Sequence, residues 1–221
     1  MSTTLSASAV AEVLARLEAL GKAKDAPAKR KVTDAEASRG SRIYGSERAR
    51  LYGEAPLSIA PEVGALLYAL VLASGARTVV EFGASYGYST IHLAAALRDL
   101  GYGHLITTEL VAEKAQAATE NLARAGLADL VELRVGDALE TLLDVGPGIE
   151  LLFLDGWNDL YLPVLELLQP RLIAGALVVA DLSRDDPHLA RYRARVCDPD
   201  ARYVSIELPL DEGVVISRLA R

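Results

Sequence analysis

One short stretch constrains the fold of this chain more than any other part of it. Residues 78–90, TVVEFGASYGYST, have the pattern of a buried strand, a turn with two glycines and the start of a helix. Gly83 and Gly87 permit a sharp bend and let a ligand approach the backbone closely. A strand, a tight turn and a helix in this order are typical of α/β proteins with a parallel sheet.

Segments typical of strands and helices alternate from residue 77 onward. The predicted strands cover residues 77–82, 104–109, 131–135, 150–154 and 176–181. The predicted helices cover residues 88–99, 111–125, 137–144, 158–169 and 186–196. Residues 203–208 and 213–217 flank a short link and predict an antiparallel hairpin. We therefore predict an α/β fold with a Rossmann-like, doubly wound seven-stranded sheet, mostly parallel with a C-terminal antiparallel hairpin.

The residues before this region differ in character. Residues 1–21 carry an amphipathic helical pattern that Gly21 closes, and residues 22–56 are polar, which predicts a cap, a lid or a partly mobile segment. A second helix is expected from Pro61 to Gly75. We therefore divide the chain into an N-terminal helix and polar cap over 1–56 and a ligand-binding domain over 57–221.

Composition narrows the choice of partners and compartment. The 221 residues carry a net charge of −7, which argues against a nucleic acid or an anionic membrane as the principal partner. A single cysteine, Cys197, excludes an internal disulfide and suits a reducing compartment. No signal peptide or membrane span is expected, so the predicted location is cytoplasmic.

An acid just before the glycines indicates the kind of ligand. The spacing E-x-G-x-x-x-G differs from the G-x-G-x-x-G of dinucleotide-binding turns, and Glu81 would repel a pyrophosphate. A cationic sulfonium cofactor suits the carboxylate better, which predicts S-adenosylmethionine (SAM). Glu109 ends the next predicted strand, where an acid accepts hydrogen bonds from ribose hydroxyls. The alternatives are a tight glycine turn with no ligand and a solvated glutamate.

The residues that end the predicted strands should meet at one edge of the sheet. Asp137 and the Ala138 amide could contact adenine, and Trp157 could form an apolar wall. Asp155 and Asp181 end the fourth and fifth strands, close enough to share a hard cation. The alternatives are aspartates that cap the following helices and a tryptophan that only packs.

With these residues in place, the chain resembles the small class I SAM-dependent O-methyltransferases of the catechol O-methyltransferase type, over residues 55–218. The motif of residues 80–89, Glu109 and the segment 154–163 carry the resemblance. It implies that 57–221 is a SAM-binding methyltransferase domain. The apolar stripe of the first helix could fold back on its own domain or pair with a second copy, and the resemblance favours the homodimer. The residues expected to bind the cofactor are Ile59, Glu81, Gly83, Ser85, Ser89, Glu109, Asp137, Ala138, Asp155 and Trp157.

Two departures from the family pattern concern catalysis. Asn158 stands where the pattern has the lysine that acts as general base, and an amide is not basic near neutral pH. Leu182 stands where an asparagine would complete a magnesium site with Asp155 and Asp181. The two aspartates are the expected catalytic residues, with His188 as a further candidate base. They could still hold Mg²⁺ or Ca²⁺ weakly, but we expect that no metal is required.

The predicted function is methyl transfer from SAM to a hydroxyl of a small, phenolic molecule. Holding acceptor, methyl group and sulfur in line supplies much of such catalysis even without a dedicated base. Two alternatives stay open: N-methylation of a small amine, and a SAM-binding pseudoenzyme or regulator with little catalysis.

Overall fold

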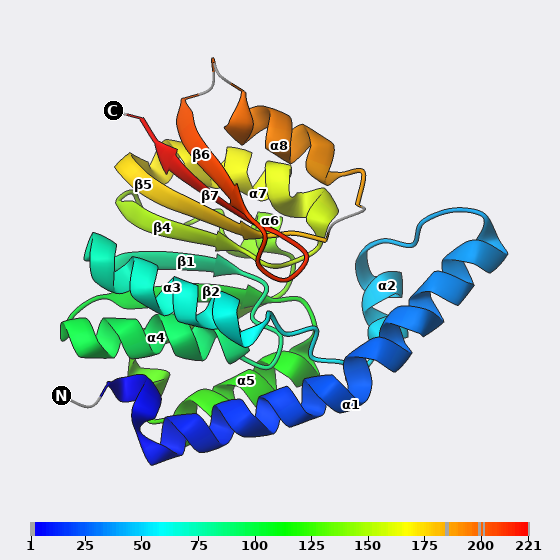
Figure 1. Ribbon diagram of the computed structural model, residues 1–221, viewed down its shortest axis with the longest axis horizontal. Coiled ribbons are helices and arrows are strands. Elements are labelled where there is room, and N and C mark those ends of the chain that lie inside the picture. The colour runs from blue at the N-terminus through cyan, green and yellow to red at the C-terminus, as the bar shows by residue number, and fades with distance from the viewer. Residues whose placement is uncertain (1–2, 184–185, 199, 201, 221) are drawn as a thin grey trace.

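A seven-stranded mixed sheet forms the centre of the molecule (Figure 1). The computed structural model describes residues 3–183, 186–198, 200 and 202–220. The strand order is β3-β2-β1-β4-β5-β7-β6, and only β7 runs antiparallel to its neighbours β5 and β6. This confirms the predicted doubly wound sheet with its C-terminal hairpin. The strands are β1 (Thr78–Phe82), β2 (His104–Glu109), β3 (Val131–Val135), β4 (Ile149–Leu154), β5 (Leu172–Asp181), β6 (Tyr203–Leu208) and β7 (Val214–Leu219).

Helices cover both faces of the sheet. One face carries α3 (Pro61–Ser74), α4 (Tyr88–Leu100) and α5 (Ala112–Arg124), with the start of α1 (Ser8–Arg39) beside them (Figure 1). The other face carries α6 (Ala138–Thr141), α7 (Tyr161–Leu168) and α8 (Leu189–Cys197). Among the described residues, no helix is long and apolar enough to cross a bilayer.

Two predicted helices are shorter than the sequence pattern suggests. The helix expected over 137–144 is the single turn α6, and the one expected over 158–169 begins with a 3₁₀ turn at Asn158–Leu160 before α7. In both places the chain is still leaving a strand end, where backbone geometry is set by the turn and not by helix propensity. The segments that differ are those that border the cavity described below.

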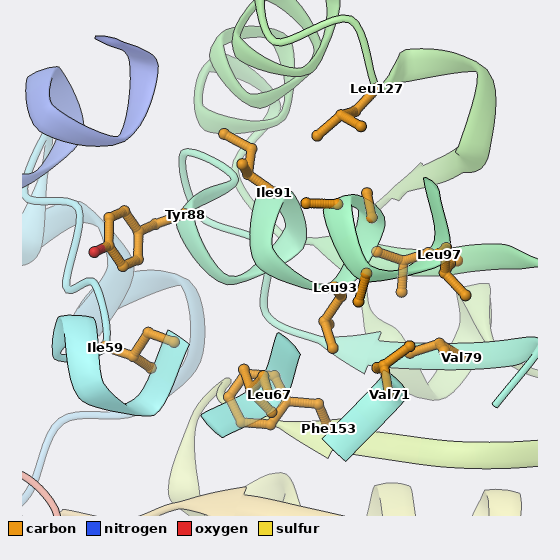
Figure 2. Packing of buried hydrophobic residues seen from close by; sticks show 14 of the residues in the cluster. Ile59, Leu67, Val71, Val79, Tyr88, Ile91, Leu93, Leu97, Leu127 and Phe153 are labelled. Atoms are coloured by element: carbon orange, nitrogen blue, oxygen red, sulfur yellow. The ribbon is translucent and has the colours of Figure 1, made fainter. Parts of the chain in front are cut away.

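Successive side chains of β4 point to opposite faces of the sheet, and each face has its own hydrophobic core. Leu151 and Phe153 pack among α3 and α4, while Leu152 and Leu154 pack among α7 and α8. All four side chains are fully buried, as expected for a strand covered on both faces. Figure 2 shows the first of these cores, where Phe153 lies near Leu67 of α3.

The prediction that the first helix ends at Gly21 is wrong. Within the described residues, α1 continues through Gly21 and Pro27 to Arg39 and ends at Gly40, whose φ of 71° is left-handed. An internal glycine costs only about 1 kcal/mol of helix stability, and the alanines and lysines that follow favour a helix. Packing against α2 (Gly45–Tyr52) also supports the far half, through the ion pairs Glu36–Arg48 and Arg39–Glu47.

The apolar stripe at the start of α1 is buried within its own chain. Val10, Val13, Leu14 and Leu17 belong to the core that also contains α3 and α4. The stripe is therefore not available as the seam between two copies. The expected homodimer stays a prediction without this support.

A buried histidine connects α3 to α4. The Nδ1 of His92 lies 2.9 Å from the carbonyl oxygen of Tyr88, so Nδ1 carries the proton. A Cβ at Gly64 of α3 would lie 2.7 Å from the His92 ring, so glycine permits this close contact. Burial lowers the pKa of His92 from its ordinary value of 6.5, so the folded protein keeps the ring neutral.

We expect His92 to make the fold sensitive to acid. Below pH 6.5 the unfolded chain binds a proton at His92 before the folded chain does, so the stability contribution is present above that pH and lost as pH falls. Urea unfolding of the unaltered protein and of His92→Gln should differ more at about pH 7.5 than at about pH 5.5. An equal difference at both pH values would contradict a buried neutral imidazole.

Candidate active site

A cavity with a volume of about 450 Å³ lies beyond the carboxyl ends of the parallel strands. It opens where the strand order reverses between β1 and β4, the position at which open α/β sheets bind ligands. The predicted site residues that line it are Gly83, Ser85, Glu109, Asp137, Ala138, Asp155, Trp157 and Asp181. The structure therefore brings together most of the residues that the sequence pattern selected.

Gly83 is fixed by close packing of two strand ends. Its φ is 101°, and a Cβ at this position would lie 2.6 Å from the carbonyl oxygen of Asp155. The Asp155 amide donates to the carbonyl oxygen of Phe82 at 2.9 Å, which joins the ends of β1 and β4. No residue with a side chain fits here without moving the backbone, so the turn needs glycine.

Glu109 is held by backbone amides beside the glycine turn. Its two carboxylate oxygens accept from the amides of Ser85 and Val111, each at 2.8 Å. Ser85 has an unusual φ of 46°, and its hydroxyl donates to the carbonyl oxygen of Pro56 at 2.5 Å. These bonds fix the carboxylate at the cavity wall, where its remaining lone pairs can accept from a ligand.

Three predicted cofactor residues do not line the cavity: Ile59, Glu81 and Ser89. Ile59 is packed in the core with α3. Glu81 is fully buried and accepts from the hydroxyls of Ser89, Thr90 and Thr107 at 2.5, 2.6 and 2.6 Å. Burial raises the pKa of Glu81, and the three hydroxyl donors oppose that shift. In this structure the carboxylate joins β1, β2 and α4, and a cofactor contact of any of the three stays a prediction.

The end of β3 and the start of α6 form another part of the wall. Asp137 accepts from the amide of Leu139 at 2.8 Å and so caps α6, which is the alternative role considered from the sequence. Asp137 and Ala138 nevertheless both line the cavity. The cap therefore orients the Asp137 carboxylate without removing it from the wall.

Trp157 forms an aromatic contact with the N-terminal segment. Its ring stacks on Tyr52 of α2 with centroids 5.6 Å apart, and the guanidinium carbon of Arg48 lies 5.6 Å from the Trp157 ring. Arg48 is held in turn by Glu36 of α1. The contacts attach α2 to the turn after β4, so α2 borders the cavity.

Asp155 and Asp181 form an acidic pair on the side of the cavity opposite Glu109. Burial, then the nearby Asp181, raises the pKa of Asp155 well above its ordinary value. Burial, then Asp211 and Glu212, raises the pKa of Asp181 to about 7, while Lys29 opposes the shift. One oxygen of Asp181, Oδ1, is buried without a hydrogen-bond partner among the described residues. The pair therefore holds a proton near neutral pH.

The donor set around this pair does not match the magnesium site that the resemblance implies. The side chain of Leu182, at the third position, has no atom that could bind a metal. Among the residues that the structure describes, no three ligand-type side chains (His, Cys, Asp or Glu) are placed to hold an ion together. Whether the reaction needs a metal is not tested by this arrangement and stays a prediction.

The other candidate bases are less well placed. Asn158 lines the cavity, and its amide donates to Asp186 at 3.3 Å. His188 lies outside the cavity lining, with Nε2 2.9 Å from the hydroxyl of Tyr44. This position makes His188 part of the contact between the cap and α8 instead of a base beside the acidic pair.

Sequence patterns missed several charged residues of the wall. Asp25 and Lys29 come from the part of α1 that was expected to be irregular, and Lys114 comes from α5. The sequence does indicate that Lys114 is buried, because it shares a helix face with the apolar Ala118 and Leu122. In the structure its side chain is 7% exposed. A lysine on the buried face of a helix needs a partner or a ligand.

Comparison with known proteins gives a consistent result. A family profile described as a methyltransferase domain matches residues 80–181. A catechol O-methyltransferase of Niastella koreensis is 34% identical over 137 residues, which cover 58% of this chain and 59% of that enzyme. A catechol O-methyltransferase of Sus scrofa is 31% identical over 136 residues, covering 58% of this chain and 72% of that enzyme. The chain thus spans less than two thirds of the Niastella relative.

Solved structures agree with the sequence relatives. An O-methyltransferase of Streptomyces achromogenes, solved in complex with SAM, superposes with a TM-score of 0.66 and 27% identity. The superposition covers 75% of this chain and 82% of that protein. The similarity thus extends beyond the segment matched by the family profile.

Glu81 should be a stability residue. We expect Glu81→Ala to lower the free energy of unfolding by about 2–4 kcal/mol, because three buried hydroxyls lose their acceptor. Glu132→Ala on β3 is the matched control, since that glutamate is 57% exposed and pairs with Arg134. Denaturant unfolding measures both, and equal small losses would contradict the structural role.

Proposed function

Because the chain belongs to the catechol O-methyltransferase-like family of methyltransferases, we propose that it transfers the methyl group of SAM to a hydroxyl oxygen of a small, phenolic molecule. The observation that carries the proposal is the cavity at the switch point of the sheet. It has Glu109, an acid placed to bind ribose hydroxyls, on one side and the buried pair Asp155 and Asp181 on the other. A cytoplasmic location and a homodimer belong to the same proposal, on the sequence alone.

The cofactor lies across the glycine turn in this proposal. Glu109 accepts from the ribose hydroxyls, and the adenine lies toward Asp137, Ala138 and Trp157. Gly83 lets the thioether region approach the end of β1, where it faces Asp155. The negative wall favours the positive sulfonium of SAM over the neutral sulfur of its product.

The acceptor lies between the acidic pair and the N-terminal cap. Tyr52 and Trp157 offer aromatic surface to a planar ring, and Asp181 faces the same space. This arrangement supports a phenolic acceptor. Part of this wall comes from α1 and α2, outside the segment matched by the family profile.

Methyl transfer is an in-line displacement. The acceptor oxygen forms a bond to the methyl carbon as the carbon–sulfur bond breaks, and the electron pair of that bond stays on sulfur, which becomes neutral. Asp181 takes the hydroxyl proton, because its pKa of about 7 leaves a useful fraction ionised at neutral pH. Asp155 keeps the pair's shared proton near the end of β4. Alignment of the three atoms supplies the rest of the rate.

The proposed activity has a direct test. The purified protein with SAM and a panel of phenols should form S-adenosylhomocysteine, and the rate should persist in EDTA because Leu182 leaves the pair without a third ligand. Loss of activity in EDTA and its return with Mg²⁺ would contradict the expectation that no metal is required. Turnover with amines only would favour N-methylation, and cofactor binding without turnover would favour a regulator.

Asp181 should set the pH dependence of the reaction. The value of kcat/KM should rise as pH passes through about 7 and then level off, since the base must lose its proton. Asp181→Asn should lower kcat by about 10²–10⁴-fold and remove this rise. Asp129→Asn, an isosteric change at a residue 63% exposed and paired with Arg98, should leave the profile intact. A rise that persists in Asp181→Asn would assign the base elsewhere.

A further inference from the structure

A short loop before α3 is fixed to the cavity wall from three sides. The hydroxyl of Ser85 donates to the carbonyl oxygen of Pro56, and the Nζ of Lys114 donates to that of Ala55 at 2.8 Å. The Leu57 amide donates to Oδ1 of Asp25 at 2.9 Å, and Leu57 itself has a left-handed φ of 53°. Two of these three contacts come from charged side chains that also line the cavity.

Lys114 is a buried ammonium with donors to spare. Its side chain is 7% exposed, and Ala55 is its one hydrogen-bond acceptor among the described residues. Burial lowers the pKa of Lys114, and the charges of Glu109 and Asp25 oppose that shift. An ammonium has three N–H donors, so two remain for a ligand in the cavity. An anionic ligand group would offset the cost of burial.

Asp25 faces the same loop from α1. One oxygen accepts from the Leu57 amide, and burial raises the pKa of the carboxyl while Lys29 and Lys114 oppose the shift. Lys114 and Asp25 thus present opposite charges to one corner of the cavity. A group that carries a positive and a negative charge close together would match both.

The direction of the cofactor places its amino-acid end in this corner. Glu109 marks the ribose in the proposed function, and the adenine runs toward Asp137 and Trp157. The other end of the cofactor must run toward Ser85 and the loop of residues 55–58, where Lys114 and Asp25 lie. That end is a zwitterion, with one carboxylate and one ammonium group.

We propose that Lys114 binds the carboxylate and Asp25 the ammonium group of the cofactor's amino-acid end, so that α5 and α1 together complete the cofactor site. This inference rests on the proposed function. It assigns a binding role to α1, which lies outside the segment matched by the family profile.

Two variants that remove charge separate this role from support of the loop. Asp25→Asn is isosteric and keeps an oxygen acceptor for Leu57. Lys114→Gln keeps an N–H donor on a side chain that is one atom shorter, and the second ligand used below reports any disturbance of the loop that follows. Lys24→Gln and Asp34→Asn on α1 are matched controls, because neither residue lines the cavity.

Calorimetry should compare S-adenosylhomocysteine with 5′-methylthioadenosine, which lacks the amino-acid end. Each site variant should bind S-adenosylhomocysteine about 10- to 100-fold more weakly, with unchanged affinity for 5′-methylthioadenosine. With S-adenosylhomocysteine lacking its carboxylate, Lys114→Gln should lose its effect while Asp25→Asn retains it. Circular dichroism should confirm that each variant is folded, and Lys114→Arg should restore affinity.

The contrary results are distinct. Equal weakening of both ligands, or no weakening of either, in the two site variants would overturn the inference and leave the proposed function standing. Failure of the unaltered protein to bind S-adenosylhomocysteine would overturn the proposed function, and this inference with it.

Discussion

The contact between the ends of β1 and β4 determines where everything else in the cavity can lie. Gly83 and the carbonyl of Asp155 approach so closely that a single methyl group at residue 83 would not fit. The approach opens the crevice at the switch point, directs Asp155 and Trp157 toward it, and places Glu109 of the neighbouring β2 on the opposite side. The buried carboxylate of Glu81 stabilises the same region, because it accepts hydrogen bonds from hydroxyls of α4 and β2. Packing and polar bonding therefore act together where the ligand is expected.

Much of this arrangement could be predicted from residue patterns. Continuous apolar runs such as that of β4 indicate strands buried on both faces, and strand-end residues of parallel strands must meet at one edge. That is why Glu109, Asp137, Asp155 and Asp181 line one cavity. The glycine at 83 was informative for the same reason, since only a tight approach of backbones requires it.

The remaining features depend on contacts between residues far apart in the sequence. Glu81 has the same spacing whether its carboxylate turns to a ligand or to Thr107, and only packing decides between them. Gly21 resembles a helix end locally, but contacts between α1 and α2 carry the helix on to Arg39. Lys114 and Asp25 meet at one loop although 89 positions separate them. The helix face of Lys114 indicates that it is buried, but no local pattern indicates that the two residues share a loop.

The length of α1 has a consequence for how such a protein can change over evolutionary time. At about 1.5 Å per residue, the helix of 32 residues reaches from the hydrophobic core to the far rim of the cavity. Its first half is constrained by packing, whereas its second half meets the cavity mainly through charged and polar side chains. Mutations at exposed positions of the second half, such as Lys29, can therefore alter what the cavity admits at little cost to folding, whereas Val32 is held by packing and Asp25 by its loop contact. Selection for binding of new small molecules could act on this half of α1 while the sheet and its glycine turn stay unchanged.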